Sequence, residues 1–225
     1  INAYRGRGHL IATTNPIRPR RLHQCDLHLE YFGLEESDLE TEFDVGNEIR
    51  LGKAQLKDII AHLEDTYCHS IGAEYRNIPN SQIRQWLHEE MEGTSNHPQF
   101  TGAVKKRILK KLAQAVGFEK FLHIKYVGQK RFSLEGGEAL IPGISVALRN
   151  AAEVYGVEEC VLGMAHRGRL NTLVNIFKKP VRDLFSEFEG KDFEDTNIDG
   201  DVKYHLGLTL SKTFRNGKQI KMNLV

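Results

Sequence analysis

Apolar residues recur at helical spacing through the first half of the chain. The first such stripe covers 56–67, and its charged side chains fall on the other faces. Two more stripes follow Ser81 and Thr101, residues of the type that caps a helix start. The pattern predicts a mostly helical module over residues 1–125. Its apolar positions are Leu56, Ile59, Ile60, Leu63 and Tyr67, then Ile83, Trp86, Leu87 and Met91, then Val104, Ile108, Leu109, Leu112 and Val116.

The pattern changes beyond Phe132. A helical stripe from Ile141 to Tyr155 ends at a glycine, and a short apolar run at 160–162 predicts a buried strand. A further helix is predicted over 170–177, where Pro180 follows. Strands that alternate with helices are typical of an α/β layer. We therefore expect an α/β fold class, with the start of an α/β domain over residues 126–225.

Apolar and polar residues alternate in the last part of the chain. Leu206, Leu208 and Leu210 share one face of a predicted strand, and the even positions of 220–224 share one face of another. Between them stands Asn-Gly at 216–217, the dipeptide favoured by a type I′ hairpin. The hairpin reaches the last residue and the chain opens on Ile1. We therefore expect a piece of a longer polypeptide whose sheet has further strands.

Composition excludes several classes of protein. Lys plus Arg number 31 and Asp plus Glu 30, so the basic excess typical of a nucleic-acid-binding protein is missing. Cys25, Cys68 and Cys160 are too few and too scattered for a disulfide framework, which indicates a reducing compartment. No run approaches the roughly 18 apolar residues of a membrane span. We expect a soluble intracellular protein with neither nucleic acid nor membrane as partner.

The segment VLGMAHRGRLN, residues 161–171, carries the strongest candidate chemistry. An apolar strand ends at a glycine and then delivers His166, Arg167 and Arg169 together. Ligands of open α/β sheets bind just beyond the carboxyl ends of strands. A histidine with two arginines suits a substrate that bears carboxylates and develops charge on an oxygen. For this segment alone, a solvated surface loop is the alternative.

Other segments resemble binding motifs but lack necessary parts. His23, Cys25 and His28 have no second ligand pair, whereas a zinc site needs four ligands, so no metal site is predicted. The glycines of 46–52 are separated by five residues rather than the four of a phosphate-binding P-loop. The basic run at 105–111 is interpreted as a solvated helix face, with docking to an acidic partner as the alternative.

Three blocks, taken in order, resemble a known family. They are RFSLEGGEALIPG at 131–143, VLGMAHRGRLN at 161–171 and GDVKYHLG at 200–207. The chain is similar to the first component of the 2-oxoglutarate dehydrogenase complex, the thiamine-diphosphate-dependent decarboxylase. YRGRGHLIATTNPI, ETEFDVGN and TYCHSIGAEYRNI extend the likeness over essentially the whole chain.

The resemblance implies roles for particular residues. His166 and His205 would contact the 2-oxo acid as the catalytic histidines, Arg169 would support a carboxylate, and Phe132 would wall the same pocket. The role of Thr209 stays open. The family's GDG motif for magnesium and diphosphate is absent, because Val202 follows Gly-Asp at 200–201. No cofactor-binding residue is therefore assigned, and the anchor for thiamine diphosphate and Mg²⁺ is expected beyond the end of this chain.

The same resemblance implies partners and a location. The substrate would be 2-oxoglutarate, and the acceptor a lipoyl group on the succinyltransferase component of this tricarboxylic acid cycle complex. The full-length enzyme would be a homodimer, located in the cytoplasm of a bacterium or in the mitochondrial matrix of a eukaryote. Three alternatives remain: a 2-oxoadipate-type enzyme, a carboligating relative, or a non-catalytic assembly module. The fragment alone is expected to be inactive.

Overall fold

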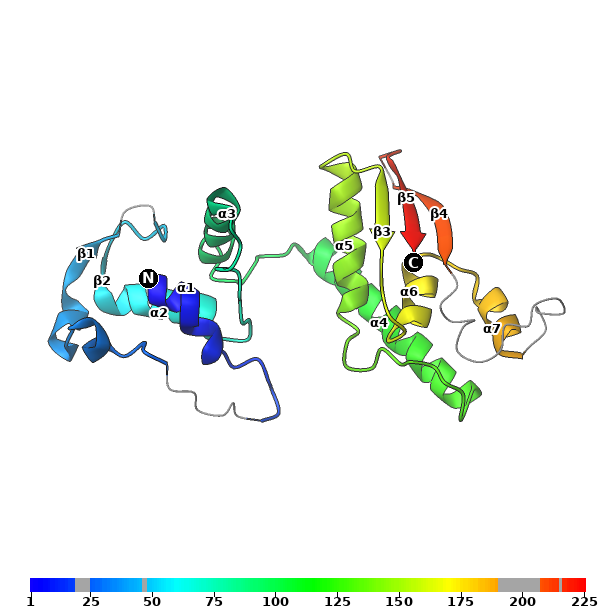
Figure 1. Ribbon diagram of the computed structural model, residues 1–225, viewed down its shortest axis with the longest axis horizontal. Coiled ribbons are helices and arrows are strands. Elements are labelled where there is room, and N and C mark those ends of the chain that lie inside the picture. Colours follow the sequence, from blue (N-terminus) through cyan, green and yellow to red (C-terminus); the bar gives the residue numbers. More distant parts are fainter. Residues whose placement is uncertain (19–24, 46–47, 190–206, 215) are drawn as a thin grey trace. The chain divides into compact units, whose positions relative to one another are not determined.

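The computed structural model describes residues 1–18, 25–45, 48–189, 207–214 and 216–225. These residues form two compact units, Ile1–Gln99 and Phe100–Val225, which we call unit 1 and unit 2 (Figure 1). None of the helices in the described ranges combines the length and apolar character that a membrane span requires.

Unit 1 is mainly helical. Its elements are α1 (Asn2–Arg7), the 3-10 helices η1 (Gly8–Leu10), η2 (Leu29–Phe32) and η3 (Glu36–Glu40), the antiparallel pair β1 (Glu42–Asp44) and β2 (Lys53–Gln55), α2 (Leu56–Tyr67) and α3 (Ser81–Glu92). The stripes predicted for α2 and α3 are confirmed as helices. The cap of α3 is Asn80 rather than Ser81, since the Asn80 side chain accepts hydrogen bonds from the N–H groups of Gln82 and Ile83.

A buried ion pair joins the helices of unit 1. Arg5 is 5% exposed and Glu92 is 2% exposed, and the guanidinium of Arg5 donates to both carboxylate oxygens at 2.7 and 2.8 Å. The hydroxyl of Tyr67 donates to the same carboxylate at 2.6 Å, which links α2 to α1 and α3. Burial and this carboxylate raise the pKa of Tyr67 far above its ordinary value. Tyr4, Ile59 and other apolar side chains form the hydrophobic core of this unit.

Unit 2 is an α/β arrangement. It contains α4 (Gly102–Lys125), α5 (Leu140–Glu153), β3 (Glu159–Leu162), α6 (Arg169–Asn175), α7 (Val181–Glu189), β4 (Leu208–Thr213) and β5 (Gln219–Leu224). The strand order is β3-β5-β4, with β3 parallel to β5 and β4 antiparallel to it. On β5, Ile220, Met222 and Leu224 are buried, whereas Gln219 and Lys221 are exposed. The helices therefore cover one face of this sheet (Figure 1).

Helix α4 belongs to unit 2. Its residues Ala115, Phe118 and Leu122 share a core with side chains of α5, α6 and β5. The boundary between the two units therefore falls between Gln99 and Phe100 along the chain, whereas the sequence pattern places it near residue 126. Thr101 caps this helix as predicted, because its hydroxyl accepts the N–H of Val104.

The predicted hairpin is present as β4 and β5. It closes through a bond from the Phe214 N–H to the Lys218 carbonyl at 2.8 Å, and the Gly217 N–H donates to the Phe214 carbonyl. The connection is therefore one residue longer than the predicted two-residue type I′ turn. Leu206, which was expected to begin the first strand, lies outside the described residues.

Candidate functional site

The loop between β3 and α6 presents the candidate histidine. The loop is shaped by Gly168, which has a φ of 73° and whose N–H donates to the Phe132 carbonyl at 2.7 Å. A Cβ at position 168 would lie 2.5 Å from Cδ1 of Leu134, a side chain that is only 3% exposed. Both the backbone conformation and the close approach require glycine here. The HRGR block and the 131–143 block are therefore packed against each other.

Phe132 and His166 form the exposed part of this site. Their ring centroids lie 4.2 Å apart at an interplanar angle of 39°. The His166 side chain is exposed and Phe132 is half-buried beneath it. Phe132 has a φ of 46°, a conformation that costs a bulky residue free energy and that recurs at functional sites. The structure thus brings together two of the four predicted site residues at the carboxyl end of β3.

Arg169 lies beneath the loop. It is 1% exposed, and its Nη1 donates to the carbonyl oxygens of Met164 at 2.9 Å and Val225 at 3.2 Å. These bonds tie the ends of the parallel strands β3 and β5 together. Burial lowers the pKa of Arg169, yet a guanidinium stays protonated at neutral pH. The sequence suggests contact with a substrate carboxylate; this geometry suits a positioning role beneath His166.

Arg167 also holds the loop in place. Its Nη2 donates to the carbonyl of Glu135 at 2.9 Å, so the second arginine joins the loop to the 131–143 block. His205, the second predicted histidine, lies outside the described residues. Thr209 lies on β4, where its hydroxyl donates to the side-chain oxygen of Asn223 at 2.8 Å.

A buried polar network anchors α6, and sequence reasoning missed it. Asn171 is fully buried, and its Nδ2 donates to the Ala115 carbonyl and to Oε1 of Glu119, each at 3.0 Å. Asn175 donates to Oδ1 of Asn171 at 2.8 Å. Helix α6, which follows the His166 loop, is thereby fixed to α4. The signal was a pair of asparagines four positions apart, Asn171 and Asn175, on one face of the predicted helix.

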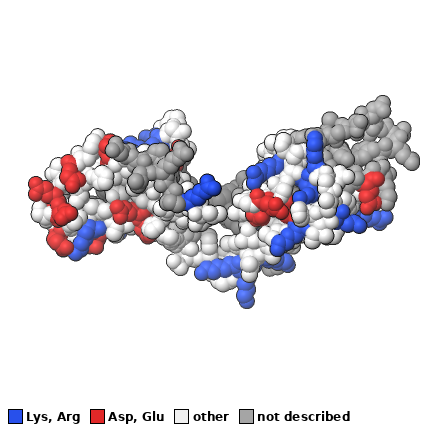
Figure 2. Space-filling view, turned by 90° about the horizontal axis from the view of Figure 1, so that it is seen from below, with Lys and Arg blue, Asp and Glu red and all other residues white. Residues whose placement is uncertain are grey.

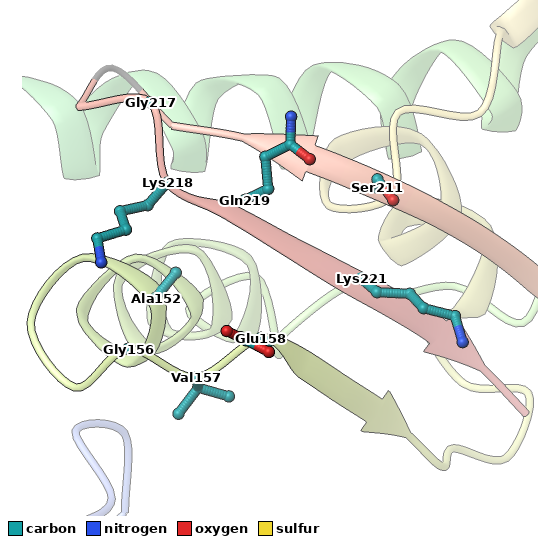
Figure 3. A pocket seen from close by; sticks show the side chains of 9 residues that line it. All are labelled: Ala152, Gly156, Val157, Glu158, Ser211, Gly217, Lys218, Gln219 and Lys221. Carbon is teal, nitrogen blue, oxygen red and sulfur yellow. The ribbon is translucent and has the colours of Figure 1, made fainter.

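A cavity of 390 Å³ lies elsewhere on the same sheet. It opens where β3 begins and the β4–β5 hairpin turns, lined by Gly156, Glu158, Lys218 and Lys221 among others (Figure 3). The His166 loop follows the opposite end of β3. This cavity is therefore separate from the candidate site.

The described residues do not fit a magnesium–diphosphate anchor. Within the described ranges, no group of three or more His, Cys, Asp or Glu side chains is placed to hold a metal ion. Cofactor diphosphates of this kind need oxygen ligands around the cation. The residues at the strand end are instead cations and a histidine, which suit the substrate side of a site.

The fold of unit 2 is α/β, and the loop at the carboxyl end of β3 presents an exposed histidine beside two arginines that hold the loop. The chain is 42% identical over 225 residues to the 2-oxoglutarate dehydrogenase E1 component of Azotobacter vinelandii. It is 41% identical over 243 residues to the mitochondrial 2-oxoglutarate dehydrogenase of Saccharomyces cerevisiae. It is also 45% identical over 226 residues to the multifunctional 2-oxoglutarate metabolism enzyme of Mycolicibacterium vanbaalenii. No protein-family model matches.

These matches cover 99% of this chain but only 23%, 23% and 17% of the respective relatives. Almost the whole chain is therefore similar to one portion of 2-oxoglutarate dehydrogenase E1 proteins, and it spans about a fifth of the length of these relatives.

Proposed function

We propose that the chain forms the substrate side of a succinyl-transferring 2-oxoglutarate dehydrogenase. The observation that carries this proposal is 41–45% identity to 2-oxoglutarate dehydrogenase E1 proteins over almost the entire chain. The exposed histidine at the end of β3 supports it, because that edge of an α/β sheet is where ligands bind.

His166 has the chemistry that a 2-oxo acid requires. An imidazole N–H can donate to the 2-oxo oxygen, and a protonated imidazole can also transfer a proton to an oxygen that becomes negative. The ring contact with Phe132 orients the imidazole, and the Gly168 N–H bond fixes the loop. We propose that His205 acts beside it and that Phe132 walls the pocket.

Arg169 contributes a buried positive charge beneath the loop. Its charge, 1% exposed, lies under the loop where an anionic substrate would approach. Low-dielectric surroundings strengthen the attraction between such a charge and a carboxylate. We therefore propose that Arg169 both positions the loop and favours the dicarboxylate 2-oxoglutarate over pyruvate.

We propose thiamine diphosphate and Mg²⁺ as cofactors of the full-length enzyme. The cofactor would supply the electron sink for decarboxylation, and protein groups supply orientation. Its anchor is assigned to the portion of the relatives that this chain does not span. Calorimetry should therefore detect no magnesium-dependent binding of thiamine diphosphate by the 225-residue chain. Tight binding that requires magnesium would show that the anchor lies within it.

The proposed partners are the lipoyl-bearing succinyltransferase component and a second copy of the full-length enzyme. We propose that the full-length enzyme is located in the cytoplasm of bacteria or in the mitochondrial matrix of eukaryotes. The substrate can be tested by assaying the full-length protein that carries this segment with 2-oxoglutarate, 2-oxoadipate and pyruvate side by side. We expect the highest kcat/KM for 2-oxoglutarate. Preference for 2-oxoadipate would indicate the related enzyme class, and preference for pyruvate would overturn the argument from Arg169. Absence of turnover with all three would favour an assembly module.

A further inference from the structure

A second cavity in unit 2 is lined by cations. It has a volume of 670 Å³ and is formed by α4, the end of α5, the segment after α6 and the β4–β5 hairpin. Five cationic side chains line it, and Glu153 is the one carboxylate among its described lining residues. Lys and Arg also gather on the part of unit 2 visible in Figure 2. The lining residues are Arg107, Lys110, Lys111, Gln114, Arg149, Glu153, Lys178, Thr213, Phe214 and Asn216.

One face of α4 supplies most of the charge. Its four lining residues, at positions 107, 110, 111 and 114, follow the i, i+3, i+4, i+7 spacing of one helix face and therefore form a single stripe. Lys105 and Lys106 belong to the same basic run but lie outside the cavity and are exposed. The sequence pattern alone interprets the whole run as a solvated face. In the structure, Arg107, Lys110 and Lys111 of this run line the cavity, and of these three only Lys111 is half-buried.

Lys178 occupies a position that favours glycine. It follows α6 with a φ of 60°, and the next N–H, that of Lys179, donates to the Leu173 carbonyl at 2.9 Å. This arrangement resembles a helix-ending turn in which a left-handed residue, usually glycine, reverses the chain. A lysine there is strained. Its side chain nevertheless lines the cavity.

The lysines of this cavity crowd one another. Nζ of Lys111 donates to the Asn175 carbonyl at 3.3 Å, at the end of α6. Burial, followed by the charges of Lys178 and Lys212, lowers the pKa of Lys111 to about 8. Burial and Lys178 also lower the pKa of Lys212, a β4 residue that is not among the lining residues of the cavity. Lysine charges placed this close repel one another unless an anion lies between them.

We propose that this cavity is a binding site for a small anion with two or more phosphate groups. Lysines serve as point charges for phosphate, and Arg149 and Arg107 offer paired N–H donors. The volume falls within the range of small-molecule sites. Oε2 of Glu153 lies 3.9 Å from Nε of Arg149, and this single carboxylate offsets only part of the positive charge of the cavity. The cavity lies by the hairpin turn, whereas His166 follows the carboxyl end of β3, so this site is distinct from the candidate substrate site.

The test is calorimetric titration of the 225-residue chain with inorganic tripolyphosphate, with citrate in a parallel arm. We expect saturable binding of tripolyphosphate that Lys111→Met weakens by about tenfold, the effect of losing one charge-assisted contact. Lys106→Met is the matched control and should change affinity by less than about twofold. Equal losses in both variants, or no saturable binding, would overturn the proposal. Tighter binding of citrate would overturn the choice of phosphate.

The variant Lys178→Gly distinguishes an effect on anion binding from an effect on stability. Glycine removes the backbone strain, so the variant should melt about 2–4 °C higher while it binds tripolyphosphate about tenfold more weakly. A variant that is more stable and binds as tightly as the parent would show that Lys178 serves no anion.

Discussion

Gly168→Ala tests how the His166 loop is held. At a φ of 73°, alanine occupies the left-handed region, which costs about 1–2 kcal/mol. The new Cβ would also lie 2.5 Å from Cδ1 and 3.3 Å from Cγ of the buried Leu134. Overpacking of this kind costs about 1–3 kcal/mol. Together the two effects predict a loss of about 2–5 kcal/mol in the free energy of unfolding of unit 2.

Gly136→Ala provides the matched control. Gly136 has a φ of 83°, but no heavy atom lies within 4 Å of an added Cβ. The control should therefore show only the backbone cost of about 1–2 kcal/mol. Combining Gly168→Ala with Leu134→Ala should cost less than the sum of the two single changes, since the smaller side chain makes room for the new methyl group.

The measurement is urea unfolding followed by far-ultraviolet circular dichroism. Because the single tryptophan, Trp86, lies in unit 1, its fluorescence follows the unfolding of that unit in the same samples. We expect the circular dichroism transition of unit 2 to shift. If Gly168→Ala loses no more stability than Gly136→Ala, the packing of the loop against Leu134 is refuted.

Three further predictions concern stability. Asn171→Leu removes the amide donor from the buried carboxylate of Glu119 and should cost about 2–4 kcal/mol in urea unfolding; a loss below about 1 kcal/mol would contradict the network. Glu92→Gln leaves the buried Arg5 with only the half-exposed Glu48 as its counter-charge and should cost about 3 kcal/mol in unit 1, whereas an unchanged midpoint would argue against the pair. The pKa of Lys111 is about 8 in the folded protein, below its ordinary value of 10.5. Between these two pH values the unfolded chain binds more protons than the folded chain. The free energy of unfolding should therefore rise as pH increases through that interval. Lys111→Met should therefore be more stable than the parent below pH 8 and lose this advantage near pH 10.5; a pH-independent difference would contradict the shift.

The sequence predicts the elements whose burial is periodic. Helices α2, α4 and α5 and the strand β5 each have buried residues on one face, and β4 alternates half-buried and exposed residues, so their apolar spacing identifies them. The run at 160–162 forms the strand β3 as predicted, but the strand is not buried, since Val161 is 62% exposed. The strands β1 and β2 were missed because they are three residues long and lack a buried residue. Periodicity shows that α4 has a buried face but not what packs against it. For this reason the sequence pattern assigned α4 to the first module and placed the boundary near residue 126 rather than at Phe100.

The site was predictable only in part. The order of the sequence blocks pointed to Phe132 and His166, but their contact depends on the bond between Gly168 and the Phe132 carbonyl. The burial of Arg169 was not predictable, because arginines are seldom fully buried and its partners are backbone carbonyls rather than side chains. The placement of Lys178 in the cationic cavity likewise depends on tertiary structure.

The most direct test of the central proposal is the turnover of 2-oxoglutarate by the full-length enzyme that carries His166→Phe. Phenylalanine retains a ring against Phe132 but has no N–H to donate. His69→Phe, at a side chain 61% exposed in unit 1, is the control. We predict that His166→Phe lowers kcat/KM by at least about tenfold with an unchanged melting temperature, while the control keeps parental activity. Parental kinetics in the His166 variant would contradict its role in the substrate site.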